Sequence, residues 1–162
     1  MQAVVITGPK KSGKTALLAL VAEVLERKGK RVAVVKYSQH DLEKGNTDAF
    51  WLMRPKRTVV NVSPEETAVL WSEQLPFEAI TKHLEADVLL MEGGDAPCSV
   101  PRIVCLPEDV DDAEFFAREC GSLTVIAVYG SALPGGIAHF PEIDPAAAER
   151  IAEIVLEKGA VV

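Results

Sequence analysis

The chain has 162 residues, of which 48% are hydrophobic and 25% are charged, and its formal net charge is −7 at pH 7. This length favours one domain over residues 1–162, and this composition is typical of a soluble globular protein. An acidic chain without a visible basic cluster is a poor partner for nucleic acid or a membrane surface, so both are excluded as expected partners.

The localisation that the sequence favours is cytoplasmic. No apolar run approaches the roughly 18 residues of a membrane span, and the first residues lead into a strand rather than a signal peptide. Cys98, Cys105 and Cys120 are odd in number and lack C-x-x-C spacing. We therefore expect reduced thiols rather than a disulfide framework.

The first apolar run, residues 3–6, leads into GPKKSGKT at residues 8–15 and then into a helical pattern from Ala16. This order matches the phosphate-binding P-loop, G-x-x-x-x-G-K-[ST], in its strand, loop and helix context. Glycines let backbone N–H groups approach phosphate, the lysine supplies positive charge, and the threonine hydroxyl is placed for Mg²⁺. The residues predicted to bind nucleotide phosphates are Gly8, Lys11, Ser12, Gly13, Lys14, Thr15 and Ala16.

An amphipathic helix is predicted to follow the P-loop and to end at Gly29, and residues 31–35 read as a buried parallel strand. Residues 36–41 then emerge at the carboxyl end of that strand, beside the P-loop, where parallel sheets bind ligands. Residues 42–57 are polar and form a candidate mobile loop or short helix over the site. Two β-rich runs, residues 58–62 and 67–71, predict a hairpin at an antiparallel edge of the sheet.

The remaining pattern continues the alternation of strands and helices. Asp144 and Pro145 provide an N-cap and a first-turn residue for the last helix. The elements are predicted at residues 77–84 (helix), 88–91 (strand), 102–106 (strand), 111–120 (helix), 123–128 (strand) and 145–158 (helix). We therefore predict an α/β fold of the P-loop NTPase type, doubly wound, with a mainly parallel sheet and an antiparallel edge hairpin.

A second part of the site is predicted at the end of strand 88–91, where Glu92 and Gly93 follow four apolar residues. P-loop enzymes commonly carry an acidic residue there, which holds Mg²⁺ through water or orients a nucleophile. Gly93 would let a backbone N–H approach the γ-phosphate. Asp41 and Asp48 are candidate ligands of Mg²⁺ or its waters, and His40 is a candidate for assisting water or substrate. Each of these loop residues has the alternative of being merely solvated.

The base of the nucleotide is left open by the motifs. The chain has no N-K-x-D or T-K-x-D sequence with which many GTPases read guanine. Base contacts are expected from the loop at residues 129–131. The alternative, that these residues form only a plain turn, fits the sequence equally well. GTP and ATP therefore both remain candidate ligands.

The assembled motifs resemble the MobB family of molybdopterin-guanine dinucleotide biosynthesis adaptor proteins. The resemblance covers essentially the whole chain. Besides the P-loop and the E-G ending of the strand at 87–93, its segments are VVKYSQHD at 34–41, GNTD at 45–48, Pro101-Arg102 and VIAVYG at 125–130. The chain departs from the family in having a single histidine in the segment 36–41, Gly94 and Asp95 after E-G, and MRP at 53–55.

The resemblance implies a GTP-binding protein with weak GTPase activity, usually a homodimer. Such proteins work beside the guanylyltransferase-type enzyme that joins GMP to molybdopterin in molybdenum or tungsten cofactor biosynthesis. By position, Lys14 and Thr15 would bind phosphate and Mg²⁺, Glu92 the metal or its water, and Asp48 would give a supporting contact.

Two rival functions stay open. One is an ATP-dependent small-molecule kinase, in which residues 42–57 would close over an acceptor hydroxyl. The other is a nucleotide-controlled adaptor that changes its affinity for a partner without hydrolysis, and the missing histidines favour it over an active GTPase.

Overall fold

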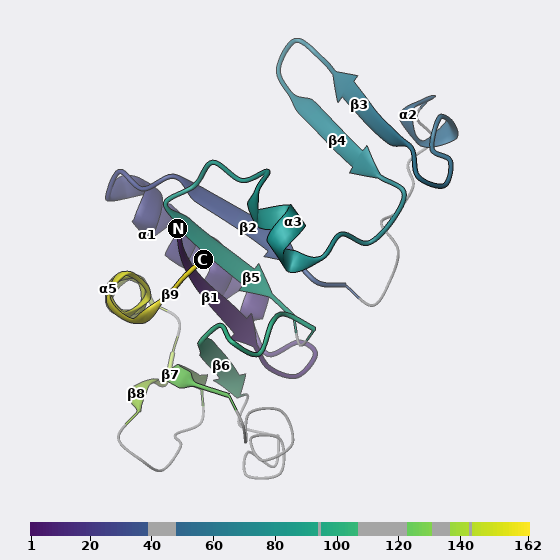
Figure 1. Ribbon diagram of the computed structural model, residues 1–162. Helices are drawn as coiled ribbons and strands as arrows, with labels where there is room; N and C mark the ends of the chain where they lie inside the picture. Colours follow the sequence, from purple (N-terminus) through teal and green to yellow (C-terminus); the bar gives the residue numbers. More distant parts are fainter. Residues whose placement is uncertain (39–47, 94, 107–122, 131–136, 143) are drawn as a thin grey trace. The chain divides into compact units, whose positions relative to one another are not determined.

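The computed structural model describes residues 1–38, 48–93, 95–106, 123–130, 137–142 and 144–162, and Figure 1 shows their elements. The chain divides into two compact units. We call Met1–Tyr37 together with Leu84–Val162 the sheet unit, and Ser38–His83 the hairpin unit. The single domain over residues 1–162 remains a prediction.

The sheet unit is built on a mainly parallel sheet, as predicted. Its described strands follow the order β2-β5-β1-β6-β7-β8, with parallel pairing throughout this path, and β9 pairs antiparallel with β1. The strands are β1 (Gln2–Thr7), β2 (Val32–Lys36), β5 (Val88–Glu92), β6 (Arg102–Leu106), β7 (Val125–Gly130), β8 (Ala138–Phe140) and β9 (Ala160–Val161). The sequence did not predict β8 and β9, because runs of three and two residues are too short for a periodic pattern.

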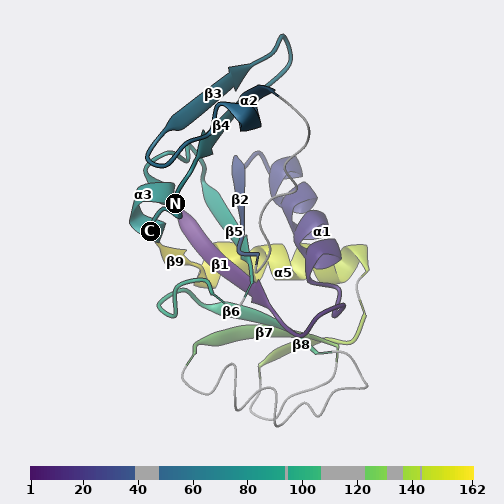
Figure 2. The same ribbon diagram turned by 90° about the vertical axis from the view of Figure 1, so that its right-hand side faces the viewer.

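Two long helices, α1 (Lys14–Arg27) and α5 (Pro145–Lys158), lie on the same face of this sheet (Figure 2). The predicted stop at Gly29 is confirmed. Gly29 adopts φ 75°, and the N–H groups of Gly29 and Lys30 donate to the carbonyls of Glu26 and Leu25. This pattern is a Schellman motif, which satisfies carbonyls at the helix end.

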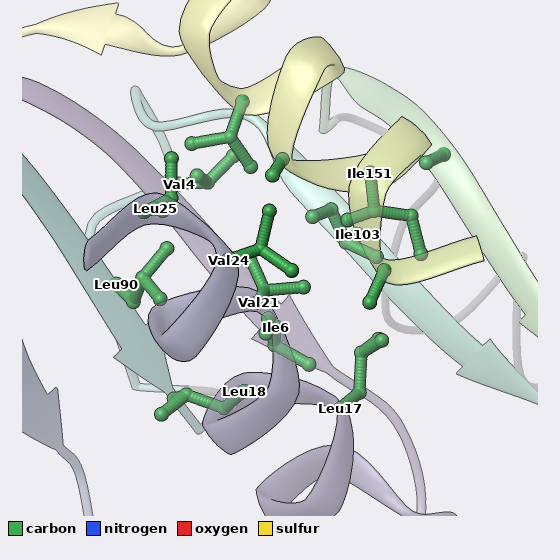
Figure 3. Close-up of a cluster of buried hydrophobic side chains, with 14 of the residues drawn as sticks. Val4, Ile6, Leu17, Leu18, Val21, Val24, Leu25, Leu90, Ile103 and Ile151 are labelled. Atoms are coloured by element: carbon green, nitrogen blue, oxygen red, sulfur yellow. The ribbon is translucent and has the colours of Figure 1, made fainter. Parts of the chain in front are cut away.

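The core lies between these helices and the sheet (Figure 3). Ile6 of β1, Leu90 of β5 and Ile103 of β6 are fully buried against Leu17 of α1 and Ile151 of α5. The opposite face of the sheet is buried too, at Ala3, Val5, Leu89 and Met91. Because apolar residues fill both faces, the central strands read as continuous apolar runs and are held rigidly.

The hairpin unit contains α2 (Asp48–Trp51), β3 (Thr58–Val62), β4 (Thr67–Trp71) and α3 (Phe77–Thr81). The predicted hairpin is present, with Thr58 opposite Trp71 and Val62 opposite Thr67. Its place differs from the prediction, since β3 and β4 form a two-stranded sheet of their own rather than an edge of the main sheet. Alternation and turn residues predict a hairpin, but they carry no information about which sheet it joins.

Parts of the predicted organisation fall outside the described residues. The helix expected at 111–120 is one, and residues 42–47 of the predicted loop are another. Within the part of the chain that the structure describes, no helix has the length and apolar character needed to cross a membrane.

Candidate functional site

The loop between β1 and α1 folds back on itself because three of its residues take left-handed backbone angles. Gly8 has φ 149°, Lys11 φ 65° and Gly13 φ 83°. Glycine adopts such angles without steric cost, whereas a lysine at positive φ is uncommon. The loop therefore has the glycine-dependent turn that the P-loop motif requires.

Gly8 lies directly against β6. A Cβ built on Gly8 would come within 2.3 Å of the Cys105 carbonyl oxygen, so no larger residue fits. Cys105 itself is fully buried, and this burial raises the pKa of its thiol to about 12, against the opposing effect of Lys14. The thiol therefore stays protonated at ordinary pH, which identifies Cys105 as packing beneath the loop rather than a nucleophile.

The N-terminus of α1 opens onto the loop. Its N-cap is Gly13, which has no side chain to cap the first turn, and that turn contains no acidic residue. The Lys14 ammonium folds across the loop and donates to the Pro9 carbonyl at 2.5 Å, 3.5 Å from Ser12 Oγ. An uncapped helix end and a lysine together form a positively charged, donor-rich concavity, which suits an anion.

Glu92 approaches the loop from the end of β5. The Thr15 hydroxyl donates to Glu92 Oε2 at 2.8 Å, and Lys36 Nζ lies 3.4 Å from Glu92 Oε1. The order β2-β5-β1 explains the contact, because it places Glu92 between Lys36 and Ile6 in register. The Glu92 side chain is 10% exposed, so its carboxylate depends on these two partners.

An open pocket of about 420 Å³ lies over these groups. Its described lining residues are Lys10, Lys11, Ser12, Gly13, Lys14, Thr15, Ala16 and Glu92. Six of these eight were predicted to bind phosphate and a seventh, Glu92, to hold the metal. Lys10 was not predicted, although its positive charge within the loop was a signal that could have identified it.

Gly93 serves the site through a close approach of two chain segments. It has φ 126°, and a Cβ there would lie 2.7 Å from the Tyr37 carbonyl oxygen. Its N–H donates to the Ile6 carbonyl at 3.3 Å in this structure. The glycine is thus needed for packing between the ends of β1, β2 and β5, and its contact with a γ-phosphate remains a prediction.

For the other predicted site residues, the structure gives no position relative to this pocket. Asp48 begins α2 in the hairpin unit, so the structure supplies no geometry between it and Glu92. His40 and Asp41 lie outside the described residues, as does Ser131 of the expected base-binding loop. Their roles remain predictions.

The donor set at Thr15 and Glu92 fits Mg²⁺. Both side chains offer oxygen, the ligand that this hard cation prefers, and Mg²⁺ is usually held by one or two carboxylates together with phosphate and water. Among the described residues, no three His, Cys, Asp or Glu side chains form a group that could hold a metal ion. A magnesium ion here would therefore depend on the phosphates of a ligand for its remaining ligands.

The parallel sheet, the glycine-dependent loop after its central strand and the adjoining Thr15 and Glu92 define an α/β protein of the P-loop NTPase-like fold class. The chain belongs to the MobB family, since the family model described as molybdopterin guanine dinucleotide synthesis protein B matches residues 3–130.

Individual relatives agree with this assignment. A protein of Methanocaldococcus jannaschii, described as a candidate molybdopterin-guanine dinucleotide biosynthesis adapter protein, is 27% identical over 116 residues, which are 67% of this chain and 48% of that protein. The chain thus spans about half the length of this curated relative. The fold is also that of Bacillus subtilis MobB, with a TM-score of 0.73, 20% identity and coverage of 95% and 98% of the two chains.

A crystal structure of molybdopterin-guanine biosynthesis protein B gives a TM-score of 0.67 at 24% identity, over 96% of this chain and 97% of the other. Both solved structures establish the shared fold. The predicted family and fold class are therefore confirmed.

Proposed function

We propose that this protein is a Mg²⁺·GTP-binding adapter in the biosynthesis of the guanine dinucleotide form of the molybdenum or tungsten cofactor. The observation that carries the proposal is the pocket formed by the P-loop and Glu92, in a chain that belongs to the MobB family. The adapter role comes from the name of the curated relative. GTP as the ligand and the attachment of GMP to molybdopterin are carried over from the family.

The pocket supports triphosphate binding through charge and donor geometry. Of the described lining residues, Lys10, Lys11 and Lys14 are cationic, and Glu92 is the acidic member. The Lys14 ammonium bonds to the Pro9 carbonyl in this structure, and that neutral acceptor is readily exchanged for a charged phosphate oxygen. The loop would therefore bind phosphate with little rearrangement of its backbone.

Hydrolysis would be slow in such a site. Bound at Thr15 and Glu92, Mg²⁺ would supply positive charge to the β- and γ-phosphates. Lys14 would neutralise the phosphates, and Glu92 would orient the metal or its water. The Glu92 carboxylate is already engaged by Thr15 and Lys36, so we do not assign it the role of a free general base. We accordingly propose weak GTPase activity at most.

Calorimetric titration with GTP and with ATP, each with Mg²⁺, tests the ligand. We expect GTP to bind at least about 10-fold more tightly, a difference of about 1.4 kcal/mol. The same titrations without Mg²⁺ should give weaker binding, because the metal neutralises phosphate charge. A preference for ATP would contradict the proposal and favour a small-molecule kinase.

Association with the guanylyltransferase tests the adapter role. The immobilised protein should retain the enzyme that joins GMP to molybdopterin, and GTP with Mg²⁺ should change the amount retained. Sedimentation of the protein alone tests whether it forms the homodimer that the family resemblance implies. Equal retention by an unrelated P-loop protein would contradict a specific partnership.

A further inference from the structure

Lys36, the last residue of β2, lies outside the P-loop motif but forms an ion pair with Glu92. Its ammonium lies 3.4 Å from Glu92 Oε1, while its own side chain is 57% exposed. The partners differ sharply in burial, since the Glu92 side chain is only 10% exposed. Lys36 therefore neutralises a carboxylate that the surrounding protein leaves poorly solvated.

Glu92 has two oxygens, and each has a different partner. Oε2 accepts a hydrogen bond from the Thr15 hydroxyl at 2.8 Å, and Oε1 faces Lys36. A cation held by Thr15 and Glu92 would bind the same carboxylate that Lys36 now neutralises. Because the two cations repel each other and share one carboxylate, each weakens the binding of the other.

On the lysine side of the pair, separation from Glu92 costs little. A lysine carries its charge on a flexible four-carbon stem, and the ammonium of a largely exposed side chain is readily hydrated. Glu92 cannot move in the same way, because it is held in register between Ile6 and Lys36 in the buried part of the sheet. Exchange therefore moves the lysine and leaves the carboxylate in place.

We propose that Lys36 is the resident counter-ion of Glu92 and that Glu92 exchanges it for Mg²⁺ when the nucleotide binds. Lys36 is thus a positioning residue that couples metal to nucleotide. Without metal it shields the phosphates from Glu92, and with metal it competes for the same carboxylate. This inference rests on the proposed binding of a Mg²⁺ nucleotide in the same pocket.

The test compares nucleotide affinity with and without Mg²⁺ in the wild type, Lys36→Met and Lys36→Arg. GTP and ATP are both titrated, in excess EDTA or in Mg²⁺. In Lys36→Met, the ratio of the dissociation constant in EDTA to that in Mg²⁺ should rise by about 5-fold or more, within the usual range of coupling between sites. Lys36→Arg should not raise the ratio, because it preserves the positive charge beside Glu92.

Two further variants separate this effect from general ones. In Lys30→Met, which removes an exposed lysine of the same unit, the ratio should equal that of the wild type. In a Glu92→Gln background, Lys36→Met should leave the ratio unchanged, because no carboxylate remains to be shared. Circular dichroism and thermal unfolding check that each variant is folded. If Lys36→Met does not fold, Lys36→Gln replaces it in the same test.

The outcomes distinguish the inference from the proposed function. A wild type that binds neither nucleotide in Mg²⁺ overturns the proposed function and the inference together. A wild type that binds, with an unchanged or smaller ratio in Lys36→Met, overturns the inference alone. An equal rise in the Glu92→Gln background also overturns it, since the effect would not pass through Glu92.

Discussion

The two units use apolar strands in opposite ways. In the sheet unit, all residues of β5 and β6 are buried, whereas in the hairpin unit Val59 is the buried residue of β3 and Val62 is 72% exposed. Val60 and Val69 stand opposite each other and are 57% and 41% exposed. Similar β-rich runs therefore form a rigid core in one unit and an open two-stranded sheet in the other.

The unit with the buried strands is also the unit that carries the pocket. All described residues that line the pocket, from Lys10 to Ala16 and at Glu92, belong to the sheet unit. Buried strands fix Glu92 and the start of the P-loop, because neighbouring side chains on both faces restrict their movement. The hairpin has no comparable core among its described residues, so its stability depends more on cross-strand pairing.

The core of the sheet unit should be far more sensitive to truncation than the hairpin. Leu90→Ala, in the core of the sheet unit, should lower the free energy of unfolding by about 2–5 kcal/mol, because it leaves a cavity. Val62→Ala in the hairpin should change it by less than about 0.5 kcal/mol. Denaturant unfolding of both variants measures the two values. Losses of similar size would contradict the contrast in burial.

Two glycines of the sheet unit differ in the space around them. Gly130→Ala should cost about 2–4 kcal/mol, since φ is 93° and the new Cβ would lie 1.9 Å from the Leu106 carbonyl oxygen. Gly29→Ala should cost only about 1 kcal/mol, because φ is 75° but nothing lies within 4 Å. Denaturant unfolding separates the clash from the backbone strain. Equal losses would show that backbone strain alone matters at Gly130.

A smaller loss is expected at the start of α5. The Asp144 carboxylate accepts a hydrogen bond from the Ala147 N–H at 2.6 Å. Asp144→Ala should lower the free energy of unfolding by about 1 kcal/mol, whereas Asp144→Asn should retain most of the cap. Thermal unfolding compares the two variants. A cap that contributes nothing would leave both transition temperatures unchanged.

The smallest effect concerns the ion pair between Arg31 and Asp87. The Arg31 side chain and its backbone N–H donate to Asp87, which lowers the pKa of that carboxyl below its usual value. The resulting stability is present above the unfolded pKa of about 3.9 and is lost as pH falls through the lower folded pKa. Since the pair is exposed, the effect should be slight.

Asp87→Asn is the matched variant for this effect. The wild type should lose slightly more stability than Asp87→Asn between pH 7 and pH 3, as measured by thermal unfolding. An identical loss in both proteins would show that the pair contributes no pH dependence.

The P-loop and Glu92 could be predicted because their signals are local. A glycine-rich loop between a strand and a helix, and an acidic residue ending an apolar strand, are both visible in a short window of sequence. The pairing of Lys36 with Glu92 could not be predicted in this way, because it depends on β5 lying between β2 and β1. Strand order depends on how the whole sheet packs. Local patterns likewise do not show that β3 and β4 form a sheet of their own.

The most direct test of the account is the affinity of Lys14→Met for GTP in the presence of Mg²⁺. Lys14 is half-buried, and its ammonium bonds within the loop, so the variant should fold with little change in thermal unfolding. Its dissociation constant should rise at least about 10-fold, as expected for the loss of a charged hydrogen bond to phosphate. Lys30→Met, an equal change of charge away from the pocket, should bind as the wild type does. Unchanged GTP affinity in a folded Lys14→Met protein would contradict the assignment of this loop as the phosphate-binding site.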